Sequence, residues 1–291
     1  GKGLLRKLML PLNLLIAMGQ SAGVLLSRRP DVVLGMGGYI TFPAGVVAAL
    51  LRRPLLIHEQ NSIAGLSNRV LARLSSRVMS GFPEVLPGAE WCGNPVRDSI
   101  AALPDPGQRY AARSGTLNLL VIGGSLGAQA LNACVPRALA MLPQDVRPQV
   151  VHQTGKQHFD LVQTAYREAK VTGEVSPFLD DMARYYSWAD IVVCRAGALT
   201  IAELAAAGVA SILVPFPHAV DDHQTGNARF LSERGAAILL PQSELTPEHL
   251  AKVLKDMSRS RALEMALAAR GLSRPGAAQR VAQACAELVP A

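Results

Sequence analysis

Short aliphatic runs that end in a glycine or polar turn recur along this 291-residue chain. Residues 117–122 lead into a glycine turn at 123–128, and residues 191–194 lead into a small-residue turn at 195–198. Strands that are buried on both faces read as continuous aliphatic runs, and they are typical of parallel sheets covered by helices. Because aromatic residues make up only 4% of the chain, its cores must be aliphatic. The pattern predicts an α/β fold with parallel sheets, and the length predicts about two domains.

The positive charge is concentrated in the first third of the chain. The net charge is +7, and residues 1–95 hold ten Lys and Arg residues against four Asp and Glu residues. A basic, apolar region predicts an anionic partner, either a membrane surface or a nucleic acid. Sites for single-stranded nucleic acid combine basic side chains with stacking aromatic ones, and before Phe82 the aromatic residues are Tyr39 and Phe42. We therefore expect an anionic membrane surface as partner and no nucleic acid.

Residues 1–27 are rich in leucine between basic ends, but polar residues and Pro11 interrupt the run. A transmembrane helix needs ~20 mostly apolar residues, so two helical pieces broken at Pro11 fit better. The segment is either a core-facing helix or an amphipathic element at the membrane interface. In the second case the residues that contact the membrane would be Arg6, Lys7, Leu8, Met9, Leu12 and Ile16.

The first part of the chain follows a strand–helix rhythm. We predict strands at 31–34 and 55–57, and helices at 43–51 and 64–74. Open α/β sheets bind their ligands at the carboxyl ends of the strands. The glycine turn at 35–39 and the polar residues at 58–61 are therefore candidate site segments, although a polar loop there could also be a plain connection.

Glycine and proline residues at 93–97 predict a domain hinge, because the composition changes there from basic to neutral. We expect a first domain at 1–97 and a second domain at 98–275. The alanine-rich tail predicts a final helix at 276–291 that crosses back onto the first domain.

The glycine turn at 123–128 can hold a diphosphate, because small residues let a ligand approach the start of the helix that follows. Ser125 would contact the phosphates or simply cap that helix. The turn lacks the G-x-G-x-x-G spacing of dinucleotide-binding folds, and no Gly-Lys-Ser/Thr occurs in the chain.

The segment at 189–204 reads as a buried strand, a tight turn and a helix that opens near Thr200. Thr200 and Glu203 have the spacing of a capping box, in which Thr200 caps the helix and Glu203 reaches back to it. Alternatively, the free amides of the helix start bind a phosphate or sugar hydroxyl.

Metal binding is not expected. Asp180 and Asp181 precede a predicted helix and are typical capping residues. Adjacent side chains such as those of Asp221, Asp222 and His223 diverge too much for a tight site. The four cysteines, which are Cys92, Cys134, Cys194 and Cys285, are far apart and fit reduced thiols.

Motifs along the whole chain, in order, resemble those of the MurG family of bacterial glycosyltransferases. They lie at 35–39 (GMGGY), 58–61 (HEQN), 93–97 (GNPVR), 123–128 (GGSLGA), 195–200 (RAGALT) with Glu203, and 215–218 (PFPH) with 223–227 (HQTGN).

The resemblance implies a GT-B architecture, in which two Rossmann-like domains face each other across a cleft. It implies transfer of GlcNAc from UDP-GlcNAc to the MurNAc 4-hydroxyl of lipid I, with inversion and without a metal or other cofactor. The product is lipid II for peptidoglycan, which serves cell shape and division. The enzyme would be peripheral on the cytoplasmic side of the inner membrane, with cell-wall synthesis proteins as further partners.

The resemblance also implies roles for single residues around the donor. Asn61 and Arg97 would reach UDP-GlcNAc, Ser125 would face its diphosphate and Leu179 would lie beside the uracil. Backbone contacts would come from Ala198, Leu199, Thr200, Ile201 and Ala202, while Glu203 would bind the ribose hydroxyls and Gln224 the GlcNAc hydroxyls.

One departure concerns the acceptor. The family's Gly-Gly-Thr-Gly-Gly-His loop would precede residue 1, so we expect the chain to lack its natural N-terminal segment and leave the catalytic base unassigned. Glu59 is a candidate base, and the alternative is that it orients loop amides. Two other functions stay open: a chain that binds UDP-GlcNAc without turnover, and a UDP-GlcNAc 2-epimerase, which shares the two-domain architecture.

Overall fold

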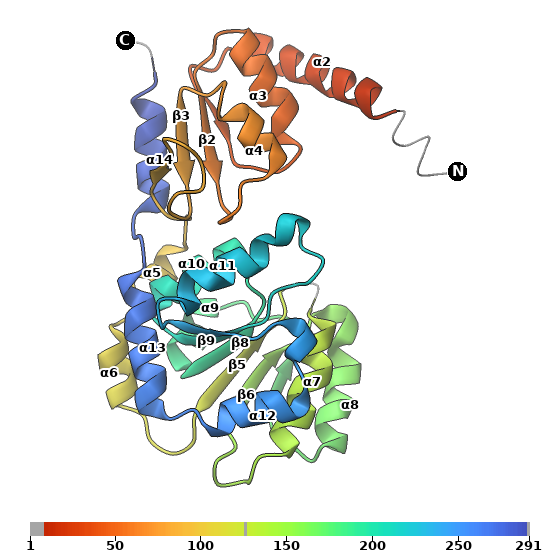
Figure 1. The fold of residues 1–291 in the computed structure, drawn as a ribbon, viewed down its shortest axis with the longest axis vertical. Coiled ribbons are helices and arrows are strands. Elements are labelled where there is room, and N and C mark those ends of the chain that lie inside the picture. The colour runs from red at the N-terminus through yellow and green to blue at the C-terminus, as the bar shows by residue number, and fades with distance from the viewer. Residues whose placement is uncertain (1–8, 125–126, 290–291) are drawn as a thin grey trace. The chain divides into compact units, whose positions relative to one another are not determined.

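The computed structural model describes residues 9–124 and 127–289, which fall into two compact units (Figure 1). The first unit runs to Asn94 and includes the residues from Gly276 onward, while the second unit is Pro95–Pro275. Each unit is an α/β domain built on a parallel sheet, which confirms the predicted fold class.

Over the described residues, the sheet of the first unit has four parallel strands in the order β1-β2-β3-β4. Its central strand β2 is buried throughout and continues past the predicted end at Ile57 to include His58 and Glu59. The strands are β1 (Val33–Gly35), β2 (Leu55–Glu59), β3 (Arg77–Ser80) and β4 (Glu90–Trp91), and the helices are α2 (Leu10–Arg28), α3 (Thr41–Leu50), α4 (Leu66–Leu71) and α14 (Ala277–Ala286).

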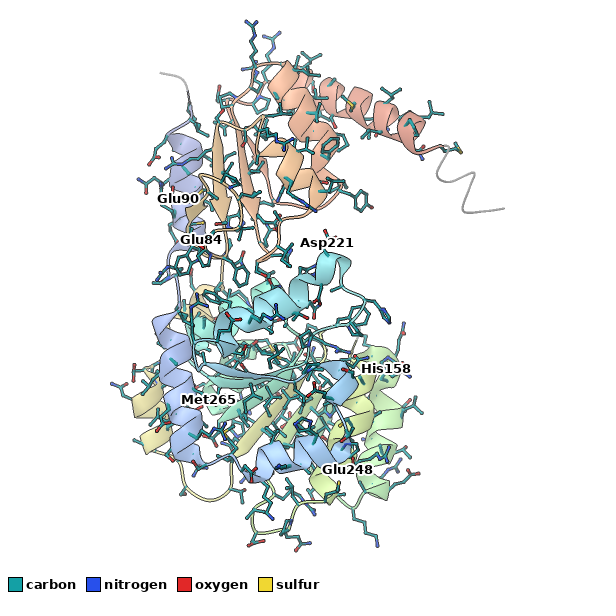
Figure 2. The ribbon with its side chains drawn as sticks, in the orientation of Figure 1. Glu84, Glu90, His158, Asp221, Glu248 and Met265 are labelled. Atoms are coloured by element: carbon teal, nitrogen blue, oxygen red, sulfur yellow. The ribbon has the colours of Figure 1, made fainter. Side chains whose placement is uncertain are left out.

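The last helix, α14, packs on the first unit. Val281 and Ala284 share a buried apolar cluster with Met79. Beside this cluster, Glu90 accepts from Arg280 at 2.5 Å and from Arg77 at 3.0 Å, and both arginines also contact Glu287 (Figure 2). Apolar burial and a charge network therefore attach the tail of the chain to this unit.

The helix α2 begins at Leu10, and Pro11 lies in its first turn. The first of the two helical pieces that we expected to meet at Pro11 lies outside the described residues. Proline is tolerated there because the first helical N–H groups have no partner within the helix. On one side, Leu25 packs against Val47 and Ala48 of α3, so part of α2 belongs to the core.

In the part of the second unit that the structure describes, the sheet has six parallel strands in the order β10-β9-β8-β5-β6-β7. The strand order reverses between β5 and β8, and ligands bind at such a switch point in open α/β sheets. Ile122 at the end of β5 and Cys194 at the end of β8 are register partners, so the turns that follow them start at the same level. The strands are β5 (Asn118–Ile122), β6 (Gln149–Gln153), β7 (Glu174–Ser176), β8 (Ile191–Cys194), β9 (Ala210–Leu213) and β10 (Ala237–Leu239).

Helices cover this sheet and enclose an aliphatic core. The core includes Leu119 and Val193 from the sheet and Met265 from α13, whereas Glu248 at the start of α12 is exposed (Figure 2). The helices are α5 (Asp98–Ala101), α6 (Pro106–Ala111), α7 (Gln129–Ala140), α8 (Phe159–Glu168), α9 (Met182–Trp188), α10 (Ala198–Ala207), α11 (His223–Ser232), α12 (Pro247–Lys255) and α13 (Arg259–Gly271), with 3-10 turns η1 (Lys156–His158), η2 (Val220–Asp222) and η3 (Gln242–Glu244).

Candidate functional site

The turn after β5 brings the backbone close to the start of α7. A Cβ atom on Gly123 would lie 2.5 Å from the amide nitrogen of Ala128, and one on Gly127 would lie 2.1 Å from the carbonyl oxygen of Thr154. Neither position has room for a side chain, so glycine is required for the turn to pack this closely against the start of α7 and against Thr154. Ser125 lies outside the described residues, and its contact with a diphosphate stays a prediction.

A cavity of about 700 Å³ lies beside this turn. Its lining combines the glycines with Arg195 after β8, Gln224 in the first turn of α11, and His158 at the end of η1 (of these, His158 is labelled in Figure 2). A guanidinium and an amide are suitable partners for phosphate oxygens and sugar hydroxyls. The cavity therefore has the chemistry that a sugar nucleotide requires.

The buried strand β8 leads through a short turn to the amino end of α10. Gly197 has extended backbone at the junction, with φ −65° and ψ 145°, and its carbonyl accepts the first helical hydrogen bond from the Ile201 N–H at 2.9 Å. The amides of Leu199 and Thr200 precede that bond and have no acceptor within the helix. Together with the positive end of the helix dipole, they form a site for an anion.

The predicted capping box is wrong. We expected Thr200 to cap the helix, but α10 begins at Ala198 and Thr200 is its third residue. Gly197 takes the N-cap position without a side-chain hydrogen bond, so the helix starts earlier than the Thr200–Glu203 spacing suggests. Glu203 makes its contacts with other parts of the second unit instead.

Two side chains hold the Glu203 carboxylate. The Tyr186 hydroxyl donates to Oε2 at 3.0 Å, and Arg97 contacts Oε1 at 3.0 Å. Burial and the neighbouring carboxylate raise the pKa of Tyr186 well above its usual value, so its hydroxyl stays protonated and donates. A carboxylate offers about four lone-pair sites, which leaves acceptor capacity for a pair of ligand hydroxyls.

Arg195 is a site residue to which we assigned no role from the sequence. Its guanidinium donates to the carbonyl oxygens of Val214 and Pro215 and to Oε1 of Gln242 at 2.6 Å, and it lies 5.5 Å from the centre of the Phe216 ring. Burial lowers the pKa of Arg195. A cation directly after a buried strand was the available sequence signal.

The other residues predicted around the donor lie in different settings. Leu179, in the loop before α9, is 3% exposed, so a uracil ring could contact its backbone but not its side chain. Gln224 accepts from the Phe216 amide at 2.9 Å, which orients its side chain. On α10, Leu199 is exposed, Ala202 is half-buried, and Ala198 and Ile201 are buried, so this helix offers backbone more than side chains.

In the first unit, both oxygens of the Glu59 carboxylate accept hydrogen bonds from the loop that follows it and from α4. Oε1 accepts from the backbone N–H of Asn61 at 2.9 Å, and Oε2 accepts from the Asn68 amide at 2.8 Å and the Gly65 N–H at 3.3 Å. The side chain is 3% exposed. This geometry supports the alternative in which Glu59 orients loop amides, and it offers little for a catalytic base.

The neighbouring polar residues also anchor this loop. His58 is fully buried, with Nε2 donating to the Gly93 carbonyl at 2.9 Å and Nδ1 accepting from the Gln60 amide at 3.1 Å. Burial lowers the pKa of His58, so the ring is neutral. Asn61 is half-buried beside Glu59, and its contact with a donor stays a prediction.

The acidic pairs have local roles. Asp181 is the N-cap of α9 and accepts from the Arg184 amide at 3.1 Å, which confirms the predicted capping role. Asp222 accepts from the Thr225 hydroxyl at 2.7 Å (the adjacent Asp221 is labelled in Figure 2). Over residues 9–124 and 127–289, no group of His, Cys, Asp and Glu side chains is arranged to hold a metal ion.

Large apolar side chains are exposed at Met9, the N-cap of α2, and along one face of this helix. Met9 is 46% exposed, Leu12 is 52% exposed and Ile16 is 51% exposed. The other residues predicted to contact the membrane, which are Arg6, Lys7 and Leu8, lie outside the described residues. None of the described helices is both long enough and apolar enough to span a bilayer.

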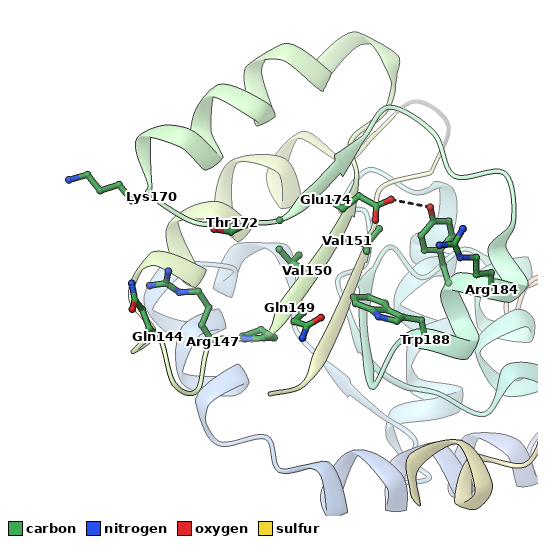
Figure 3. Close-up of a pocket in the computed structure, with 13 residues that line it drawn as sticks. Gln144, Arg147, Gln149, Val150, Val151, Lys170, Thr172, Glu174, Arg184 and Trp188 are labelled. Carbon is green, nitrogen blue, oxygen red and sulfur yellow. Dashed lines mark hydrogen bonds between the residues drawn. The ribbon is translucent and has the colours of Figure 1, made fainter. Parts of the chain in front are cut away.

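A second cavity, of about 660 Å³, lies at the amino ends of β6 and β7 (Figure 3). Gln149 and Trp188 line it, and a hydrogen bond of 3.1 Å from Tyr185 to Glu174 runs along its wall. Because the glycine turn follows the carboxyl end of β5, this cavity is separate from the candidate site.

Two family models match most of the chain. Residues 1–80 match the glycosyltransferase family 28 N-terminal domain, and residues 118–281 match the glycosyltransferase family 28 C-terminal domain. The second match covers the glycine turn, α10 and the segment with Gln224.

Individual proteins extend this likeness. The chain is 59% identical to the UDP-N-acetylglucosamine–N-acetylmuramyl-(pentapeptide) pyrophosphoryl-undecaprenol N-acetylglucosamine transferase of Cupriavidus metallidurans, over 99% of this chain and 81% of that protein. It is similar to the crystal structure of Acinetobacter baumannii MurG, with a TM-score of 0.87 and 40% identity over 95% of this chain and 79% of that one. This likeness confirms the predicted GT-B architecture.

A UDP-GlcNAc 2-epimerase from Neisseria meningitidis also has a similar fold, with a TM-score of 0.64 over 94% of this chain and 81% of that one. The identity is 12%, so this likeness shows the fold alone.

Proposed function

The chain belongs to glycosyltransferase family 28, and on that premise we propose that it transfers GlcNAc from UDP-GlcNAc to lipid I. The acceptor is undecaprenyl-diphospho-MurNAc-pentapeptide, and the product is lipid II for peptidoglycan synthesis. The name of the Cupriavidus metallidurans relative describes this reaction, and the identity to it extends over nearly the whole chain.

The observation that carries the proposal is the amino end of α10 at the switch point of the second unit. The unpaired amides of Leu199 and Thr200 suit the donor diphosphate, and Glu203 on the same helix suits the ribose hydroxyls. Gln224 and Arg195 line the adjacent cavity and would contact the sugar and the phosphates. This arrangement supports the second unit as the donor domain.

In the proposed reaction, the MurNAc 4-hydroxyl attacks the anomeric carbon of GlcNAc and the bond from that carbon to the phosphate oxygen breaks. Attack from the face opposite the leaving group inverts the anomeric configuration. The hydroxyl proton passes to a general base, and UDP leaves with the bonding electron pair. The α10 amides are suited to stabilise the charge that develops on the departing diphosphate.

The exposed apolar face of α2 supports peripheral binding to the membrane that holds lipid I. Met9, Leu12 and Ile16 would enter the interface, while Arg28 and Arg29 at the end of the helix would face anionic headgroups. Because UDP-GlcNAc is a cytoplasmic metabolite, we place the protein on the cytoplasmic side of the inner membrane. By supplying lipid II, it would serve cell shape and division alongside other cell-wall synthesis proteins.

A transfer assay with radiolabelled UDP-GlcNAc and a lipid I analogue tests the proposal. We expect labelled lipid II and an equal amount of released UDP. Binding of UDP-GlcNAc without lipid II formation would instead favour a donor-binding module. Formation of UDP-ManNAc in the absence of acceptor would favour an epimerase.

A further inference from the structure

Tyr186 lies on α9, outside the segments singled out from the sequence. Its side chain is 1% exposed, and its hydroxyl donates to Oε2 of Glu203 at 3.0 Å. Glu203 lies on the next helix, and its side chain is 19% exposed. A fully buried phenol thus donates a hydrogen bond to a carboxylate that is partly exposed to solvent.

We infer that Tyr186 is a positioning residue for the donor ribose, because its hydroxyl fixes the rotamer of Glu203. With one lone pair of Oε2 bound to Tyr186, the remaining lone pairs of the carboxylate point toward the amino end of α10 and accept from the two ribose hydroxyls. The inference rests on the proposed function, since it assumes that Glu203 binds the ribose of a uridine nucleotide.

The two partners of Glu203 differ in how easily a ligand can replace them. The Arg97 side chain is 53% exposed and can swing into solvent, so a ribose hydroxyl can take its place on Oε1. Tyr186 is enclosed by protein and cannot leave without disturbing the core. The tyrosine bond therefore persists in the complex, and it can orient the carboxylate before the nucleotide arrives.

A buried arginine holds the two helices in the required positions. Arg109 donates to the Tyr186 carbonyl at the end of α9 and to the carbonyls of Ala207 and Gly208 at the end of α10. These bonds occupy carbonyls that the helix ends leave without partners, and the positive charge suits the negative end of the α10 dipole. Arg109 thus helps to fix the distance between Tyr186 on α9 and Glu203 on α10.

The test is the variant Tyr186→Phe, which removes one oxygen and keeps the ring. Calorimetric titration of the full chain with UDP and with 2′,3′-dideoxy-UDP measures whether the effect passes through the ribose hydroxyls. We expect the Kd for UDP to rise about tenfold, as for the loss of one hydrogen bond to a charged group. The Kd for the dideoxy nucleotide should stay within about twofold of the wild-type value, because the hydroxyls that Glu203 would accept from are gone.

Tyr166→Phe is the matched control, because Tyr166 is another buried tyrosine of the same unit and its hydroxyl bonds to His152 at 3.0 Å. It should leave both dissociation constants unchanged. An equal loss of affinity for both nucleotides in Tyr186→Phe would mean a merely structural role and overturn the inference, as would no change for either. Wild-type protein that fails to bind UDP would overturn the proposed function as well, which separates the two failures.

Discussion

Glu59 ends the buried strand β2 and Glu203 lies on the helix that follows the buried strand β8, and the surroundings of the two carboxylates differ. Glu59 is 3% exposed, and both of its oxygens are occupied by the N–H groups of Asn61 and Gly65 in the loop that follows and by the Asn68 amide on α4. The Glu203 side chain is 19% exposed, and it is held by one buried partner, Tyr186, and one exposed partner, Arg97.

The difference shows why a strand-end carboxylate does not by itself define a site. A carboxylate whose lone pairs are filled by neighbouring N–H groups stabilises the local fold. A carboxylate that is oriented from one side and open on the other can accept from a ligand. We therefore assign the first to the scaffold and the second to donor binding.

At neutral pH the largest effect should follow Glu59→Ala, as a loss of stability. The change leaves the Asn61 and Gly65 N–H groups and the Asn68 amide without their acceptor, so we expect the free energy of unfolding to fall by about 3 kcal/mol. Urea unfolding measures this loss. Glu84→Ala, which truncates an exposed glutamate of the same unit, should change stability little (Figure 2).

The reverse pattern should follow Glu203→Ala. UDP affinity should fall by about 1–3 kcal/mol, because the acceptor for the ribose hydroxyls is lost. Titration calorimetry measures the affinity. The Glu59→Ala variant, where it is folded, should bind UDP with wild-type affinity. If Glu59→Ala lost UDP affinity and Glu203→Ala kept it, the assignment of Glu59 to the scaffold and Glu203 to donor binding would be reversed.

Acid should destabilise both units through one histidine in each. Burial lowers the pKa of His58 in the first unit and lowers that of His152 in the second to about 3. Unfolded histidine takes up a proton near pH 6.5, so below that pH the unfolded state binds more protons and stability falls. For His152 the fall is up to about 1.4 kcal/mol per pH unit. For His152 the loss continues down to about pH 3.

The two tryptophans allow this prediction to be tested in each unit separately, because Trp91 lies in the first and Trp188 in the second. Urea unfolding at several pH values, followed by fluorescence in variants that keep one tryptophan, reports each loss. His152→Gln should flatten the pH dependence of the stability that Trp188 reports, and it should not change the pH dependence of the stability that Trp91 reports. An unchanged slope at Trp188 would show that another group titrates.

The smallest effects should come from the exposed face of α2. Leu12→Ser and Ile16→Ser should each weaken binding to anionic vesicles by about 1 kcal/mol. Each change removes an apolar side chain that is about half exposed and could enter the membrane interface. Vesicle sedimentation measures the binding. Leu161→Ser, on α8 of the second unit, is the control for an exposed leucine, and an equal loss there would argue against a membrane face on α2.

Elements whose signals are local could be predicted from the sequence. The strand at 191–194 has the predicted limits, and α7 begins at Gln129 as expected, because an aliphatic run between polar residues sets these boundaries. The strand β2 runs beyond its predicted end because His58 and Glu59 are buried within the sheet. The partner that makes burial of His58 possible is the Gly93 carbonyl, which is distant in sequence.

The contacts of the donor site depend on tertiary structure. Tyr186 and Arg97 reach Glu203 from segments 17 and 106 residues away, and no local spacing reports such pairs. The capping-box prediction was wrong for a related reason. The local spacing suggested a partner for Glu203 within its own helix, whereas its partners come from other segments. Resemblance to a family identified Glu203, while the side chains that orient it required the structure.

The central claim is that the amino end of α10 holds the donor nucleotide. Amide NMR of ¹⁵N-labelled protein during a UDP titration tests it most directly, because Leu199 and Thr200 have N–H groups without helical acceptors. We predict that these two amide resonances shift downfield and saturate together as UDP binds. Resonances that stay in place at saturating UDP would contradict the account.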